Sequence, residues 1–170
     1  MIEVQHIHPI FVHFVIAPLV IAIVFDFLWL IKKYDYFEKF SWYNLIVAGV
    51  FGILSVISGL IAEEKVVFSD TSLEIFEYHE IMAFILIIFL QIQVLWRLGL
   101  KGKIPRKHSY LYFIVTIACL VSVISTSYFG GKLVFDFGIG INSSNTINKK
   151  NTPEGYKPKF QFVKPDTSKN

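Results

Sequence analysis

The stretch HIHPIFVHFVIAP, residues 6–18, places three histidines at the start of an apolar run that is long enough to cross a bilayer. Imidazole is the commonest metal ligand among side chains, and it is costly to bury in a membrane without a partner. The function therefore depends on what the rest of the chain brings to these histidines.

Composition indicates a membrane protein. Of the 170 residues, 54% are hydrophobic and 16% are aromatic, and the mean hydropathy is +0.57, which is far from the usual soluble composition. The net charge of +3 is small and the lysines lie in short loops and a tail, so nothing supports nucleic-acid binding. The single cysteine, Cys119, excludes an internal disulfide and a cysteine-only metal site, and we interpret it as a packing residue.

Four segments reach the roughly 20 apolar residues that a membrane-spanning helix needs; they cover residues 9–31, 43–62, 81–98 and 110–129. We predict an all-α integral membrane protein, a four-transmembrane-helix bundle within residues 1–141. Residues 142–170 lose the apolar periodicity and are predicted to form an extended polar C-terminal tail. The first segment lacks a positive n-region and is followed by lysines, which favours an uncleaved anchor.

Positive charges in short loops predict the orientation, because lysine and arginine are retained on the cytoplasmic side. The loops after the first and third spans are basic. The loop between the second and third spans carries Lys65 alone against six acidic residues, which are Glu63, Glu64, Asp70, Glu74, Glu77 and Glu80. We therefore predict a multi-pass protein of the bacterial inner membrane with both termini outside.

Local signals suggest how the first span is built. Pro9 is suited to the first helical position, where the missing N–H has no intrahelical partner, so His8 is expected at the cap. Asp26, near the inner end of the same span, is expected to form an interfacial ion pair with Lys32 or Lys33.

The later spans carry capping and packing signals. Residues 71–74, Thr-Ser-Leu-Glu, match a capping box that predicts a helix start near Ser72 and holds His79 two turns into that helix. The second span has a stripe of small residues, which predicts close helix contact or a flat macrocycle near Gly59; it comprises Ala48, Gly52, Ser55, Gly59 and Ala62. The fourth span is expected to end at residues 130–131. We find no convincing internal repeat.

This topology brings several polar side chains to the outer ends of the spans, and they form one candidate site; they are His6, His8, His13, Glu63, Glu64, His79, Lys132 and Asp136. His108 falls on the basic side and is expected to be solvated. His8 and His13 are five residues apart, about 140° around a helix, so they cannot both point at one ion if both are helical.

A pair of histidines on different spans suits a haem b. We predict His13 and His79 as axial ligands, with His8 in reserve or bonded to a propionate and Lys132 neutralising a propionate. Ala17 and Ala83 each lie four residues after one ligand, which leaves room on the same helix face beside Gly59. The alternatives are a zinc, copper or iron site from His6, His8, Glu63 and Glu64, or histidines that only hydrogen-bond between helices.

The motif HPIFVHF at residues 8–14 resembles the bacterial membrane family catalogued as domain of unknown function 2231, whose pattern opens His-Pro-x-x-Val-His-Phe-Pro-Ile. Further matches are residues 58–62, His79 with Ala83, and residues 130–135 leading to 138–141. Val15 replaces the proline of the motif, and Phe137 replaces a histidine whose role therefore does not carry over. The resemblance implies a four-span inner-membrane domain, in relatives sometimes joined to Rieske or cytochrome c modules.

The leading hypothesis is a small haem b electron-transfer subunit at the outer face of the inner membrane, serving a redox complex and not a stand-alone enzyme. Its acidic loop, residues 63–80, would attract a cationic carrier such as a c-type cytochrome or a Rieske protein. The alternative is a cofactor-free accessory subunit whose histidines and tail bind neighbouring subunits. No nucleophile, catalytic base or nucleotide-binding loop indicates a hydrolase or a dehydrogenase.

Overall fold

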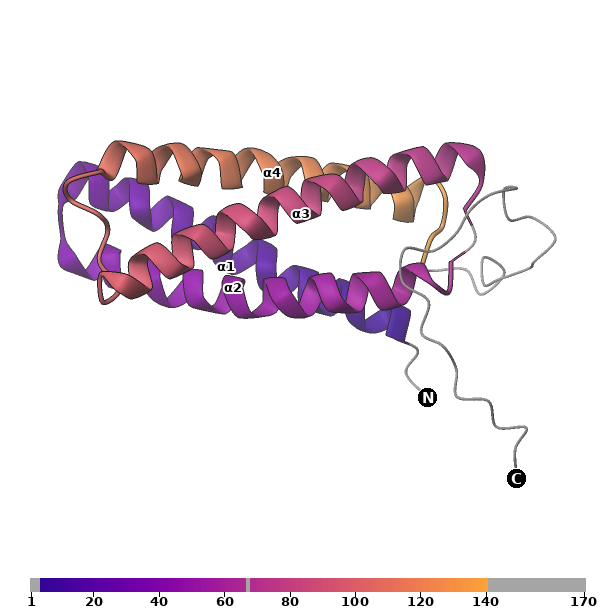
Figure 1. The fold of residues 1–170 in the computed structure, drawn as a ribbon, viewed down its shortest axis with the longest axis horizontal. Helices are drawn as coiled ribbons and strands as arrows, with labels where there is room; N and C mark the ends of the chain where they lie inside the picture. Colours follow the sequence, from indigo (N-terminus) through magenta and orange to yellow (C-terminus); the bar gives the residue numbers. More distant parts are fainter. Residues whose placement is uncertain (1–3, 67, 141–170) are drawn as a thin grey trace, which may run out of the picture.

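The computed structural model describes residues 4–66 and 68–140, with side chains from residue 7 onward, and within these ranges it is all-helical without β-strands. It has four long helices arranged as one elongated bundle (Figure 1), and they are α1 (Val4–Lys32), α2 (Asp35–Glu63), α3 (Asp70–Gly99) and α4 (Ser109–Phe135). Each contains a window apolar enough to cross a membrane. The predicted four-helix membrane fold is confirmed, while the tail after residue 141 lies outside the described residues.

The helices are longer than the predicted spans. At 27 to 30 residues and a rise of about 1.5 Å per residue, each exceeds 40 Å against a hydrocarbon core of about 30 Å. The apolar pattern marks only the part inside the lipid, so polar first turns such as residues 35–39 give no hydropathy signal. The expected stop at residues 130–131 is wrong, because α4 continues through both glycines to Phe135.

The predicted start of the first helix is also wrong. The structure begins α1 at Val4, so Pro9 lies inside the helix and His8 is a helical residue instead of a cap. A proline there removes only the hydrogen bond to the carbonyl of Gln5, a loss that neighbouring helices in a bundle can tolerate.

The helix start before His79 uses a different capping box from the predicted one. The Ser69 hydroxyl accepts from the backbone N–H of Ser72 at 3.3 Å, and the Ser72 hydroxyl accepts from the N–H of Ser69 at 2.8 Å. Helix α3 therefore starts at Asp70, two residues before the expected position. Serine replaces the glutamate of the usual box because either side chain reaches the free N–H at this distance.

The bundle consists of two antiparallel hairpins. Helix α1 packs mainly on α2 and α3 mainly on α4, while α2 and α3 supply most of the contact between hairpins. In Figure 1, α3 runs obliquely across the view between α2 and α4. We call the end with His8, Glu63, His79 and Phe135 the histidine end, and the opposite end the arginine end.

The two hairpins are structurally equivalent at a constant offset of 71 residues. The His8 ring bonds the carbonyl of a residue 47 positions later, and so does the His79 ring; 79 minus 8 gives 71. Similarly, Asp26 and Arg97 each contact a hydroxyl 15 residues later; 97 minus 26 gives 71. Both first helices run the same way, so the fold is a parallel repeat of a helical hairpin, an arrangement known in membrane proteins.

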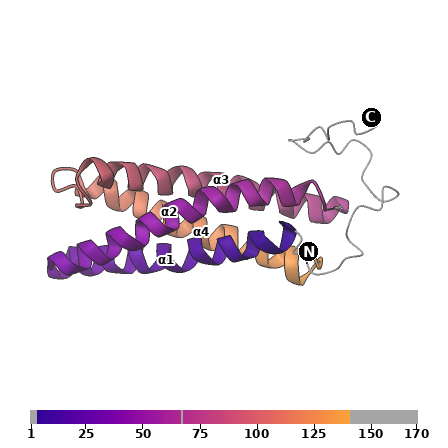
Figure 2. The ribbon, with the colours of Figure 1, turned by 90° about the horizontal axis from the view of Figure 1, so that it is seen from below.

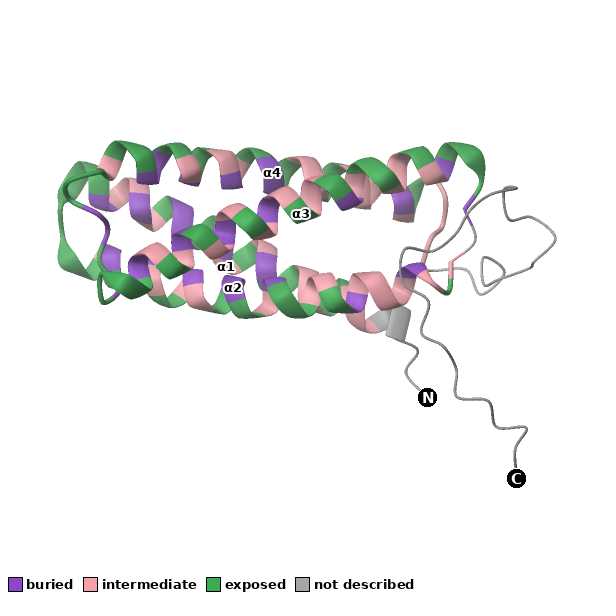
Figure 3. Ribbon diagram, in the orientation of Figure 1, coloured by how far each residue is buried: buried purple, intermediate pink, exposed green. Residues whose placement is uncertain are grey.

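The core follows the same repeat. Figure 3 shows the buried residues on the inward faces of all four helices. Equivalent positions are buried in both hairpins, and the pairs are Val15 with Leu86, Leu19 with Leu90, and Ala48 with Cys119. Cys119 is a packing residue as expected, and its thiol donates to the Gln93 side-chain oxygen at 3.4 Å.

The small-residue stripe of α2 serves two neighbours. A methyl group built at Gly52 would lie 2.7 Å from Ile87 of α3, so this glycine lets the two hairpins approach. Ser55 and Gly59 instead face His8 of α1. The prediction of close helix contact is therefore confirmed, and the His8 ring occupies the space beside Gly59.

A buried ion pair joins the hairpins near the arginine end. Asp26 contacts Arg97 at 3.0 Å with both side chains almost fully buried, so the expected partners Lys32 and Lys33 are wrong. Those lysines follow Asp26 along the helix, whereas Arg97 comes from the facing helix and lies deeper. The Tyr112 hydroxyl donates to the second Asp26 oxygen at 2.6 Å, and Ser41 donates to the first.

The same guanidinium fixes the loop between α3 and α4. Arg97 donates to the carbonyl of Gly102 at 2.8 Å and to the carbonyl of Glu38 at 2.7 Å. All its partners accept, so the buried charge is paired and fully hydrogen-bonded, as a charge in a membrane protein must be.

Candidate functional site

The first candidate ligand, His8, is held between α1 and α2. Its Nδ1 lies 3.0 Å from the carbonyl oxygen of Ser55 and 3.1 Å from the Ser58 hydroxyl. One turn further along α2, a methyl group at Gly59 would approach the ring to 3.0 Å. The ring therefore packs directly on the α2 backbone, which requires a glycine at this point.

The second candidate ligand, His79, repeats this arrangement between α3 and α4. Its Nδ1 lies 3.0 Å from the carbonyl oxygen of Thr126. A methyl group at Gly130, one turn later, would again come within 3.0 Å of the ring. Each hairpin thus presents one half-buried histidine through the same pair of contacts.

These contacts determine the tautomer of both rings. A carbonyl oxygen only accepts, so Nδ1 of each ring is the donor, and in the neutral imidazole Nε2 then carries the lone pair. No hydrogen bond to either Nε2 comes from the described residues. A backbone carbonyl bonded to one ring nitrogen is the usual support of a histidine whose other nitrogen binds a metal.

His13 has different surroundings. It is exposed, and its Nδ1 contacts the carbonyl of Pro9 on its own helix at 2.6 Å. Ala17, one turn later, is exposed as well, whereas Ala83 after His79 is half-buried. His8, the predicted reserve ligand, therefore makes the same kind of contact as His79, whereas His13 lies on the outside of α1.

The acidic residues do not complete a metal cluster with these histidines. Glu63 is buried at the end of α2, and Glu64 is half-buried next to it. Among the described side chains no group of three or more His, Cys, Asp or Glu is arranged to hold a metal ion. The side chain of His6 lies outside the described residues.

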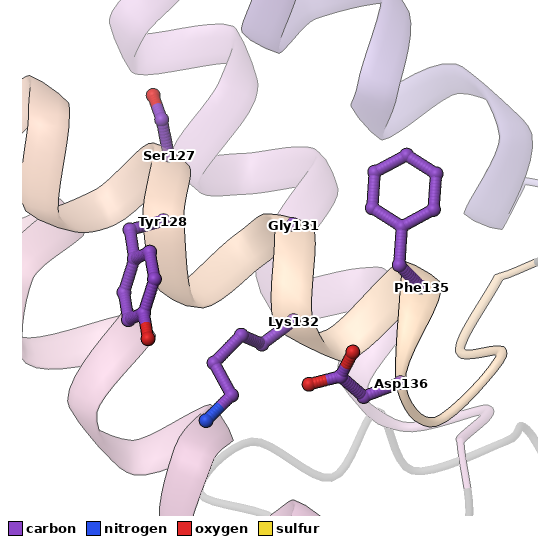
Figure 4. A pocket seen from close by; sticks show the side chains of 6 residues that line it. All are labelled: Ser127, Tyr128, Gly131, Lys132, Phe135 and Asp136. Carbon is purple, nitrogen blue, oxygen red and sulfur yellow. The ribbon is translucent and has the colours of Figure 1, made fainter.

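Lys132 lies on another face of α4. It is two residues after Gly130, about 200° around the helix from the face that contacts His79. It lines a shallow surface hollow of about 320 Å³ with Tyr128, Phe135 and Asp136. Figure 4 shows these side chains. Its ammonium lies 5.8 Å from the centre of the Tyr128 ring, and Asp136 is exposed.

The donor chemistry at the histidine end fits a haem. Neutral imidazole is a ligand that haem iron accepts, and a haem would bring the remaining iron ligands with its own macrocycle. The Thr126 hydroxyl, beside the partner of His79, is buried without a hydrogen-bond partner among the described residues. A polar group of a cofactor bound next to His79 would give this hydroxyl a hydrogen-bond partner.

Sequence reasoning missed Ser55, Thr126 and Gly130 as supporting residues. The signal is present in the sequence, since each of His8 and His79 is followed 47 residues later by a Ser or Thr and then, four residues on, by glycine. It is weak, because serine, threonine and glycine are common in membrane helices.

A family model described as "Predicted membrane protein (DUF2231)" matches residues 5–143. Comparisons with curated proteins and with solved structures found no match. The matched region includes α2, α3 and α4, all of α1 except its first residue, and both histidine contacts.

Proposed function

The chain belongs to the DUF2231 family of predicted membrane proteins, and we propose that this member is a haem b-binding electron-transfer subunit with His8 and His79 as the axial ligands. One observation carries the proposal: the two imidazoles occupy equivalent places in facing hairpins, and each is bonded through Nδ1 to a backbone carbonyl. Haem b, when bound, supplies reversible one-electron chemistry at its iron.

The protein's own contribution is to hold two neutral imidazoles in fixed positions. Each carbonyl keeps the proton on Nδ1 and makes the other nitrogen more basic. The His8 ring packs on the helix backbone at Gly59, and the His79 ring packs on it at Gly130, so each ring is restricted on that side. The Asp26–Arg97 pair joins the two hairpins that carry the ligands.

An acidic face next to this site supports a cationic redox partner. Asp70, Glu74 and Glu77 are exposed and lie at positions i, i+4 and i+7 of α3, so they share one side of the first turns. Such a face steers a positively charged carrier by long-range attraction. A c-type cytochrome is the partner we propose, with a Rieske protein as the alternative, at the outer face of the bacterial inner membrane.

The experiment measures haem content in protein purified from cells with a full haem supply. We expect about one haem per chain in the wild type, and loss of the haem in His8→Ala and in His79→Ala. His13→Ala is the matched control: this exposed histidine is on the same helix as His8, and its replacement should leave the haem in place. A colourless wild-type protein would instead support the cofactor-free accessory subunit.

A further inference from the structure

A polar pocket of about 450 Å³ lies at the arginine end, between the start of α2 and the loop that joins α3 to α4. We call it the arginine-end pocket. Its walls come from two segments far apart in the sequence, and the residues used below are Lys39, Trp42, Tyr43, Lys101, Lys103 and Arg106. It is at the opposite end of the bundle from His8 and His79 and has no part in the proposed electron transfer.

Hydrogen bonds fix the walls of this pocket. The buried Arg97 holds the carbonyl of Gly102, and the backbone N–H of Ile104 donates to the Glu38 carboxylate at 2.6 Å. The loop turns at Gly102, which has a φ of +84° that favours glycine. A methyl group at Gly102 would lie 2.6 Å from the Trp42 ring, so this ring packs against the loop.

The pocket carries more positive than negative charge. Four cationic side chains line it, against the two carboxylates of Asp35 and Glu38. Glu38 is buried and already accepts from Ile104 and Arg106. The three lysines are exposed, and within the described part of the chain none forms an ion pair. Their charge is therefore available to an anion.

The pocket also lies at the level where a membrane meets water. Exposed aromatic side chains, which mark the headgroup region of a bilayer, surround this end of the bundle, and they are Tyr34, Tyr36, Phe40, Tyr43 and Tyr110. An exposed apolar stripe leads from the pocket along α2 towards the middle of the membrane, and it consists of Tyr43, Val47, Val50 and Leu54. These positions are spaced i, i+4, i+7 and i+11, so they form one side of the helix.

We propose that the arginine-end pocket binds the phosphate headgroup of an anionic phospholipid, with the lysines around the phosphate and an acyl chain along the exposed stripe of α2. Basic pockets between membrane helices recognise such headgroups through charge, whereas a zwitterionic headgroup gains little from them. Free phosphate has the same anionic group but no acyl chain. The apolar stripe therefore favours a lipid over free phosphate.

The test is native mass spectrometry of the full chain in detergent, titrated separately with phosphatidylglycerol, phosphatidylcholine and inorganic phosphate. We expect phosphatidylglycerol to bind in preference to the other two. Replacing two pocket lysines, Lys39→Gln with Lys103→Gln, should weaken its binding about 30-fold, taking about 1 kcal/mol per lysine near a membrane surface. The charge-retaining pair Lys39→Arg with Lys103→Arg should keep binding within about threefold, which shows that the glutamine effect is electrostatic.

The matched control is Lys32→Gln with Lys107→Gln, which removes the same charge from exposed lysines at the same end but outside the pocket. Binding should change by less than about threefold, as expected for exposed charges outside the pocket that water and salt screen. Equal weakening in both glutamine pairs would overturn the pocket in favour of a diffuse surface charge. Phosphatidylcholine binding as tightly as phosphatidylglycerol would overturn the anionic specificity, and inorganic phosphate binding as tightly would overturn the lipid.

Discussion

The Asp26 carboxylate and the Arg97 guanidinium, which occupy equivalent positions in the two hairpins, meet at 3.0 Å inside the bundle. The two residues occupy the same position of the repeated hairpin, but they carry opposite charges. The ion pair therefore joins the hairpins near one end of the bundle. The equivalent histidines His8 and His79 lie near the other end.

Removing one partner of this ion pair should destabilise the protein strongly. We expect Arg97→Met to lower the free energy of unfolding by about 3–5 kcal/mol, because Asp26 is left as an unpaired buried charge. The measurement is reversible unfolding in detergent followed by tryptophan fluorescence. Lys32→Met, an exposed cation at the same end, should change stability by less than about 0.5 kcal/mol. A loss below about 1 kcal/mol for Arg97→Met would contradict the role of the pair.

Two adjacent glycines of α4 provide an internal comparison. A methyl group at Gly130 would press on the His79 ring at 3.0 Å, whereas one at Gly131 would meet nothing within 4 Å. Alanine favours a helix by about 1 kcal/mol over glycine, so Gly131→Ala should stabilise α4. Gly130→Ala should lose that gain to crowding of about 1–3 kcal/mol and should also lower the haem content. Equal behaviour of the two variants in thermal unfolding and haem assays would argue against the packing of His79 on Gly130.

Gly52 should control the contact between hairpins. A methyl group there would lie 2.7 Å from Ile87, so Gly52→Leu must push α2 away from α3. We expect a cost of about 1–3 kcal/mol in unfolding experiments. Gly99→Ala, a control glycine on α3 with nothing within 4 Å, should not destabilise the protein. If Gly52→Leu unfolds like the wild type, the hairpins do not pack as described.

Much of the fold follows from apolar periodicity and length. Four runs of apolar residues predict four helices, because backbone groups in lipid must be hydrogen-bonded within the segment. The prediction of the helix ends is less accurate, since polar first turns outside the lipid leave no hydropathy signal. The predicted start of the first helix is wrong because it depends on Pro9. A proline suits a helix start, yet it is also tolerated inside a membrane helix.

The repeat is weak in the sequence because equivalent residues outside the histidine contacts often differ in chemistry. Asp26 is equivalent to Arg97, although their charges are opposite. Their hydroxyl partners Ser41 and Tyr112 are also equivalent, although the two side chains differ in size and shape. What is kept is burial and spacing, which a residue-by-residue reading does not detect. The same limit applies to the choice between His13 and His8 as a ligand, since only the packing of α1 on α2 shows which side of α1 is exposed.

The acidic face of α3 should govern the rate of electron transfer with a cationic carrier. Replacing Glu74 and Glu77 by lysine should lower the association rate about tenfold or more at low ionic strength, with little effect at high salt, since steering is screened there. Stopped-flow oxidation of the reduced protein by a c-type cytochrome gives this rate. Asp35→Lys, at the far end of the bundle, is the control. Equal rates for all variants at low salt would exclude this face as the docking surface.

The most direct test of the proposed site is low-temperature electron paramagnetic resonance of the purified, oxidised protein. Two axial imidazoles make ferric haem low-spin, so we expect a low-spin signal in the wild type and in His13→Ala, and its loss in His8→Ala and His79→Ala. The absence of any haem signal in wild-type protein from haem-sufficient cells, or a low-spin signal that survives replacement of either His8 or His79, would contradict it.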